Sequence, residues 1–275
     1  MNGIRLTLRK TLDVPVEAGN ISPRVFAGRS LAEIEALPLR RGNRSTTLSA
    51  LFDVTGTSAR MEEEVAITLE GDAAKLRWIG HKMRGGQVMV KGSAGFYLGE
   101  EMSGGEIVVE GNAGSWAGSL MSGGRIEIRG SAGHYLGGGY RGCSAGMTGG
   151  SLVVHRGVGD NAGYLMAGGV ITIRGNAGQF TGVRMKEGHI LVEGDAESRI
   201  GALMTGGRIA VRGRVASILP SFSIDEVRSR VRIGDERVQG PFYVFKGDVT
   251  ESWNGSLYIS IQSNPHLKPY ESKIA

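Results

Sequence analysis

The sequence predicts an all-β fold: a right-handed parallel β-helix of about eight coils of ~19 residues, with small capping segments at both ends. The first observation is a spacing. Methionines recur at gaps of 19, 19, 26, 19, 19 and 19 residues, at Met83, Met102, Met121, Met147, Met166, Met185 and Met204. Each opens the same phrase, roughly M-x-G-G-x-I-x-V-x-G-x-A-G-x-x-x-G. A fixed period of this length is typical of stacked structural repeats.

The second observation is a short strand in every period. The fifth and seventh residues after each methionine are aliphatic and mostly β-branched, which places them on one face of a strand. These positions are Val88, Ile107, Ile126, Leu152, Ile171, Ile190 and Ile209, then Val90, Val109, Ile128, Val154, Ile173, Val192 and Val211. Charged residues such as Glu110 and Arg129 follow directly, so each period alternates as a strand with one buried face does.

The third observation is glycine at the corners. The chain has 46 glycines in 275 residues, and Gly-Gly precedes the strand in six of the seven copies. Glycine adopts positive φ at little cost and allows close backbone approach. The glycines follow no G-X-Y period, which excludes a collagen-like chain.

Residues 1–61 are predicted to form an N-terminal capping segment. Ile4, Leu6 and Leu8 alternate as in a strand. Ser30 and Glu33 match a capping box, which predicts a short helix from Ser30 to Leu37 before Pro38. The run LSALFDV, from Leu48, has apolar residues at helical spacing. VAITLEG, at 65–71, resembles a degenerate first coil, so the β-helix is expected over residues 62–220.

The single irregular step of 26 residues predicts an insertion at 137–146. An insertion in a regular solenoid is typically a loop on one face, often a binding face. Residues 221–275 are predicted to form a C-terminal cap or arm, because two strand-like runs, FYVF at 242–245 and SLYISI at 256–261, follow the last repeat. The charged stretch SIDEVRSRVRIGDER between them and the repeats has no assignment from sequence.

Composition narrows the protein class. The formal charge is +5, but no nucleic-acid-binding motif accompanies it. No run of about 18 apolar residues predicts a membrane span, and no apolar core follows the N-terminus as in a signal peptide. Cys143 is the single cysteine, so there is no disulfide framework. We therefore expect a cytoplasmic protein with neither nucleic acid nor membrane as partner.

The sequence contains no recognisable catalytic constellation. Its five histidines show no metal-ligand spacing, and no cysteine pair is available for zinc or an iron–sulfur cluster. GVGDNAG, at 157–163, mimics a dinucleotide fingerprint but lies within a repeat and precedes no helix. We expect no catalytic, cofactor-binding or metal-binding residue in this chain.

Two columns of the repeat indicate binding to a partner. The sixth residue after each methionine faces outward, yet five of the seven are apolar, among them Val108, Val153 and Leu191. These three, with Tyr140 and Arg141 of the insertion, are the candidate partner contacts, unless the chain's own terminal segments cover the row. The fourteenth residue is often aromatic, as at Tyr97, Trp116, Tyr135 and Phe180, which fits either a core column or an exposed ridge.

The repeats resemble the C-terminal glycine-repeat domain of the glutamate synthase large subunit, and still more the C subunit of formylmethanofuran dehydrogenase. The flanks favour the second family. They are the leader LTLRKTLDVPVEAGNISPRVFAGRSLAEIEALPLRRGNR with LSALFDV, the YRG of the insertion, LPSF after the last coil, and the terminal FKGDV and NGSLYI. The resemblance covers essentially the whole chain.

This resemblance implies a non-catalytic scaffold subunit in a complex of one-carbon metabolism. The first interpretation is the formyltransferase/hydrolase complex of methylotrophic bacteria, which moves a formyl group from formyl-tetrahydromethanopterin to a methanofuran analogue and releases formate. The alternative is an archaeal tungsten or molybdenum formylmethanofuran dehydrogenase. A glutamate synthase-type domain and a β-helical carbohydrate-active enzyme are further alternatives.

The resemblance also implies where partners and cofactors lie. The chain itself would bind no cofactor, while the complex would use a methanofuran-type carrier and a metal in the hydrolase subunit. The main partner would be that hydrolase (A) subunit. A second possible contact is the acidic polyglutamyl tail of the carrier, for which Arg141 is the candidate, because a guanidinium pairs well with carboxylates.

Overall fold

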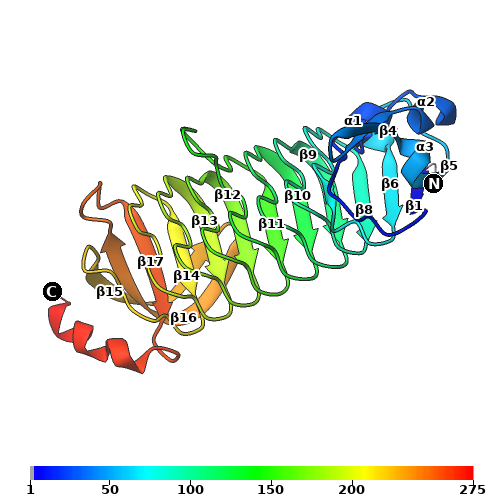
Figure 1. Cartoon of the computed structure of the whole chain (residues 1–275). Helices are drawn as coiled ribbons and strands as arrows, with labels where there is room; N and C mark the ends of the chain where they lie inside the picture. The colour runs from blue at the N-terminus through cyan, green and yellow to red at the C-terminus, as the bar shows by residue number, and fades with distance from the viewer. Residues whose placement is uncertain (1–2, 275) are drawn as a thin grey trace.

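The computed structural model describes residues 3–274; residues 1–2 and 275, at the outer ends of the two predicted capping segments, lie outside the described residues. One parallel strand per coil forms the body of the molecule, and successive strands lie side by side along its length (Figure 1). These strands are β6 (Ala66–Glu70), β8 (Gln87–Lys91), β9 (Ser103–Val109), β10 (Gly123–Ile128), β11 (Ser151–Val154), β12 (Ala167–Ile173), β13 (Glu187–Val192) and β14 (Arg208–Val211).

Pairing between coils is in register. Ile126 lies opposite Ile107 on one side and Leu152 on the other, so equivalent repeat positions are neighbours across the sheet. A second line of single bridges joins the coils from Ala73 to Val215, at a position that is alanine in every coil except at Val158 and Val215. The sequence prediction of mostly parallel, period-matched strands is therefore confirmed.

The interior is built from the methionine and aliphatic columns. All seven methionines are fully buried, and the fourteen strand positions are at most 1% exposed, as predicted. Burial of each such side chain contributes roughly 1.5–3 kcal/mol. Close packing requires glycine next to them: at Gly163, φ is +72°, and a Cβ would collide with Ile190 of the following coil.

The N-terminal segment both extends the sheet and covers one end of the stack (Figure 1). Strand β1 (Gly3–Leu8) pairs in parallel with β6 and antiparallel with β5 (Phe52–Gly56). A small second sheet holds β2 (Val16–Glu17), β3 (Pro38–Arg41), β4 (Arg44–Thr47) and β7 (Leu76–Arg77), and its β2–β7 pairing fastens the segment to the first coil.

Three short helices complete this segment: α1 (Pro23–Phe26), α2 (Leu31–Glu35) and α3 (Leu48–Leu51). The predicted capping box is present, with Ser30 as the N-cap of α2 and Glu33 returning to its backbone. The helical interpretation of LSALFDV is wrong beyond Leu51, because Phe52 begins strand β5. Pairing of β5 with β1 overrides the local apolar spacing there. A 3₁₀ turn at Glu62–Glu64 then leads into β6.

At the C-terminal end a long hairpin follows the last coil. Its strands are β15 (Ser223–Ile233), the stretch without a sequence assignment, and β16 (Glu236–Gly247). The chain then returns as β17 (Gly255–Ser260), which pairs antiparallel with β16 and in parallel with β14. The predicted cap therefore supplies one more parallel strand. A 3₁₀ helix at Pro265–Lys273 ends the described chain, and none of its helices is long and apolar enough to span a membrane.

Candidate functional site

The aromatic column forms a half-buried ladder along one side of the coils. Trp78 stacks on Tyr97 with ring centroids 4.7 Å apart, and Trp116 stacks on Tyr135 at 4.1 Å. Coil spacing of about 4.8 Å brings equivalent side chains to stacking distance. The sequence left open whether this column was core or exposed ridge. It is neither, because each of these rings is partly buried.

The insertion folds back over this ladder. The ends of the insertion are joined by a hydrogen bond from the Met147 amide to the Gly137 carbonyl at 2.9 Å. In a regular coil the equivalent bond joins residues only three apart, as from Met102 to Gly99. The Tyr140 ring lies 5.0 Å from Trp116 and 6.3 Å from Tyr97, centroid to centroid. Lys186 Nζ also donates to the Ser144 carbonyl at 2.7 Å. The loop is thus held at several points by the coils on either side.

The Tyr140 hydroxyl donates a hydrogen bond to the Glu100 carboxylate. Burial raises the pKa of Tyr140, and the neighbouring Glu100 raises it further, so the phenol stays protonated. Burial alone would raise the pKa of Glu100 as well, but its contacts with His81 and Tyr140 outweigh burial, and the pKa is lowered. Glu100 is therefore an ionised carboxylate that is only 7% exposed.

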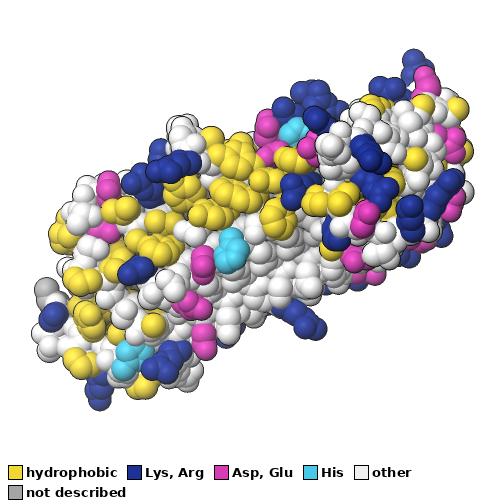
Figure 2. All heavy atoms as spheres, viewed as in Figure 1, with side chains coloured by type: hydrophobic (Ala, Val, Ile, Leu, Met, Phe, Trp, Pro, Cys, Tyr) yellow, Lys and Arg dark blue, Asp and Glu magenta, His cyan; other side chains and the backbone are white. Residues whose placement is uncertain are grey.

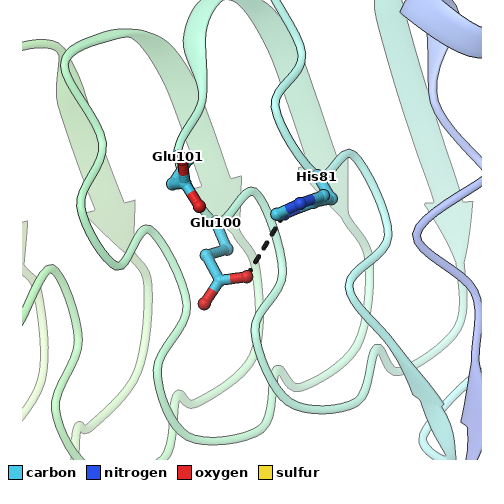
Figure 3. A group of neighbouring side chains, drawn as sticks. All are labelled: His81, Glu100 and Glu101. Carbon is cyan, nitrogen blue, oxygen red and sulfur yellow. Dashed lines mark ion pairs between the residues drawn. The ribbon is translucent and has the colours of Figure 1, made fainter. Parts of the chain in front are cut away.

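His81, Glu100 and Glu101 come together beside this contact (Figure 3). His81 Nδ1 lies 3.2 Å from Glu100 Oε2, at ion-pair distance but without hydrogen-bond geometry. Lys82 Nζ lies 3.5 Å from Glu101. This cluster was not predicted from the sequence, although a signal was present. His81 and Glu100, like Lys82 and Glu101, are 19 residues apart and so occupy the same position in successive coils.

These side chains have the donor types that hold a divalent cation. Their carboxylates, however, are already engaged by Tyr140, His81 and Lys82. A cation would have to displace those contacts, so the arrangement fits a structural tether for the insertion better than a metal centre. The expectation that this chain binds no metal stays a prediction.

The outward row is divided between two environments. Val108 on β9 and Val153 on β11 are half-buried, and Glu127 lies between them in ion pairs with Arg125 and His155. Leu191 on β13 is 1% exposed beneath the C-terminal hairpin. Leu191 as a partner contact is therefore wrong, because the chain's own hairpin covers it.

The two insertion candidates also differ. Tyr140 turns its ring and hydroxyl toward its own chain, so within this structure it supports the loop rather than standing free. Arg141 is exposed and forms no ion pair within residues 3–274. Figure 2 shows hydrophobic side chains in a band along the coils, bordered by acidic and histidine side chains. A partner contact at either residue stays a prediction.

Comparison with known proteins decides the family. The chain is 46% identical over 274 residues to the C subunit of tungsten-containing formylmethanofuran dehydrogenase 2 from Methanococcus maripaludis, covering 97% of this chain and 100% of that one. The chain belongs to the formylmethanofuran dehydrogenase C subunit family. It is also 39% identical over 98 residues to the protein of the same name from Methanothermobacter wolfeii, a match that spans only 36% of either chain.

A solved structure extends the relationship of this C subunit family member. The present chain matches a chain of the formyltransferase/hydrolase complex (FhcABCD) from Methylorubrum extorquens, solved in complex with methylofuran. The TM-score is 0.82 and the sequence identity is 28%. The match covers 93% of this chain and 99% of that chain. No family model matches the sequence. The family resemblance seen in the leader and repeats is thereby confirmed.

Proposed function

We propose that this chain is the non-catalytic C subunit, a scaffold, of a formyltransferase/hydrolase complex. In this proposal the complex transfers a formyl group from formyl-tetrahydromethanopterin to a methanofuran analogue and releases formate. The observation that carries the proposal is the match across almost the whole chain to a chain of the FhcABCD complex. The transfer and hydrolysis would take place on other subunits, with the metal in the hydrolase subunit.

Two features of the chain support a scaffold role. The group of His and Glu side chains around Glu100 is occupied by contacts within the chain and lies at the base of the insertion. The fold itself is a rigid stack of in-register coils, which we propose to be a right-handed parallel β-helix, since crossovers between parallel strands are almost always right-handed. Such a stack presents long, fixed surfaces to partners.

We place the partner interface on the uncovered part of the outward row and on the insertion. Val108, Val153, Tyr140 and Arg141 are the remaining candidate contacts. The hydrolase subunit is the proposed partner, and a stable scaffold contact should bury more than about 2,000 Å² in total. Arg141 is alternatively proposed to meet the polyglutamyl tail of the carrier.

The interface is tested by co-purification. Val108→Asp places a charge on the half-buried row, and Arg141→Ala removes the exposed guanidinium; each is expected to reduce recovery of the hydrolase subunit. Glu197→Ala, which changes an exposed carboxylate beside the line of alanine bridges, is the matched control. Circular dichroism verifies the fold of each variant. Unchanged assembly in both test variants would place the partner on another face.

A second candidate is the C subunit of a tungsten or molybdenum formylmethanofuran dehydrogenase. The observation in its favour is the 46% identity over 97% of this chain to a protein of that name. Purifying the native complex separates the two proposals. A co-purifying hydrolase and formyltransferase without tungsten or molybdenum supports the first, whereas tungsten or molybdenum with iron–sulfur subunits supports the second. A cytoplasmic location follows from either proposal and remains to be tested by fractionation.

A further inference from the structure

A strongly basic groove lies between the β15–β16 hairpin and the coils that it covers. Two adjoining hollows of about 260 and 530 Å³ share Arg208, Arg228 and Tyr258 in their walls. Arginine dominates the smaller hollow and Lys246 lines the larger. We call this region the hairpin groove and define it by Arg208, Arg228, Arg230, Arg232, Arg237 and Lys246.

The strand register explains why so many cations meet there. His189 on β13 lies opposite Arg208 on β14, which lies opposite Ser256 on β17, which in turn lies opposite Lys246 on β16. The hairpin adds Arg232 directly opposite Arg237. Like charges opposite each other on paired strands are destabilising. The fold therefore tolerates a repulsion that a bound anion would relieve.

Carboxylates of the chain neutralise only part of this charge. Arg228 pairs with Glu226 at 2.6 Å, and Arg232 pairs with the exposed Asp235 at 3.3 Å. Arg208, Arg230 and Arg237 form no ion pair with any carboxylate in the described part of the chain. Arg208 donates one hydrogen bond to the Arg232 carbonyl at 3.4 Å. Three guanidinium groups without a carboxylate partner among the described residues thus line one groove.

His189 provides an independent observation at the same place. It lines the larger hollow, and its Nδ1 is buried without a hydrogen-bond partner among residues 3–274. Burial lowers the pKa of His189, and the charges of Arg208 and Arg232 lower it further. Burial, with the neighbouring arginines, thus disfavours the charged form of this imidazole, whose unpartnered Nδ1 lies beside the groove. Perturbed titratable groups of this kind are concentrated at functional sites.

We infer that the hairpin groove binds an anionic ligand that carries two or more carboxylate or phosphate groups. A guanidinium donates two parallel hydrogen bonds to either oxyanion, and several guanidiniums converging on one groove select multiply charged ligands over single ions. The groove lies over β13, β14 and β17, away from Val108, and the inference does not depend on the function proposed above. Phosphate and carboxylate share this recognition chemistry, and separate probes distinguish them.

The test is isothermal titration calorimetry on the full-length chain, with pyrophosphate and citrate as separate probes, at about 0.15 M ionic strength, where weak surface attraction is largely screened. At least one probe is expected to bind saturably. Arg208→Gln and Arg230→Gln should each weaken binding about tenfold, since each removes a charge-assisted hydrogen-bonding group. The stronger probe identifies the ligand as phosphate or carboxylate.

Arg212→Gln is the matched control, because it removes an exposed guanidinium just beyond the opposite end of β14 and should leave binding unchanged. NMR titration of His189 gives a second readout: its pKa is expected to rise when the stronger probe is bound. The charges facing His189 are Glu187 on its own strand, Arg208 on β14, Arg228 and Arg232 on β15, and Lys246 on β16. Absence of saturable binding by both probes would overturn the inference, as would equal weakening in Arg212→Gln.

Discussion

Over β9 and β11 the outward side chains Val108 and Val153 are half-buried among ion pairs, whereas over β13 and β14 Leu191 and Ala210 are 1% and 0% exposed. All four occupy the same position of the repeat. The difference comes from the hairpin, whose Val231, Ile233, Val238, Phe242 and Val244 form a second apolar cluster with Tyr258 on the outer face. One repeat position therefore belongs to a surface in one half of the molecule and to a core in the other.

The largest expected effect comes from removing the cover. Phe242→Ala should lower the free energy of unfolding by about 3–5 kcal/mol, because it leaves a cavity beneath the hairpin. Urea denaturation measures this. Phe96→Ala is the matched control, since Phe96 is 43% exposed on the aromatic side of the coils, and it should cost less than about 1.5 kcal/mol. Equal costs would mean that the hairpin does not pack as a core.

A matched pair within the outward row tests the comparison directly. Leu191→Ala should cost about 2–5 kcal/mol, whereas Val153→Ala should cost under about 1 kcal/mol, because only the first residue is fully enclosed. The same denaturation measurement applies. If the Val153 change proved the more costly, the hairpin would not be the cover in solution.

The interior should show no such contrast. Gly99 and Gly182 occupy equivalent corners in the two halves, with φ of +63° and +72°, and a Cβ at either would collide with an isoleucine of a following coil. Alanine at each site should cost about 1–3 kcal/mol, and the two costs should be similar. Thermal unfolding of both variants checks this; clearly unequal costs would show that the two halves differ inside as well as outside.

The smallest effect concerns the insertion, which covers the aromatic ladder in one half of the molecule. Tyr140 lies over Trp116, whereas the Arg199 guanidinium lies over Phe180, 5.0 Å from its ring centroid. Tyr140→Phe removes the hydrogen bond to Glu100 and should loosen the loop by about 1–2 kcal/mol. Hydrogen exchange at the amides of Gly139 and Gly146 reports this opening, with Gly163 as an internal control.

The same contact predicts a pH dependence. Because the folded pKa of Glu100 is lowered from its ordinary value of 4.5, its stabilisation is fully present above pH 4.5 and is lost as the pH falls through the folded pKa. Loop protection should therefore decline in acid in the parent chain and less so in Tyr140→Phe. If protection of the loop amides declined equally with falling pH in both proteins, the Glu100 carboxylate would not be the group that holds the loop.

The sequence by itself determined the features that depend on neighbours at one fixed offset. The 19-residue period sets which residues stack, so the buried methionine and aliphatic columns, the glycine corners and the position of the insertion all follow from it. The capping box at Ser30 is equally local. The same period also placed His81 beside Glu100, a pair that inspection of histidines alone overlooks.

Only the tertiary structure decided what covers each outer surface. Leu191 and Val231 meet although no repeat period relates their positions, and Phe52 becomes strand because β1, far back in the chain, offers it a partner. Tyr140 turns inward because Glu100 and Trp116 lie within its reach. Such contacts depend on where a non-repeating segment docks, and docking is set by the summed apolar and polar fit of distant surfaces, which leaves no fixed spacing in the sequence.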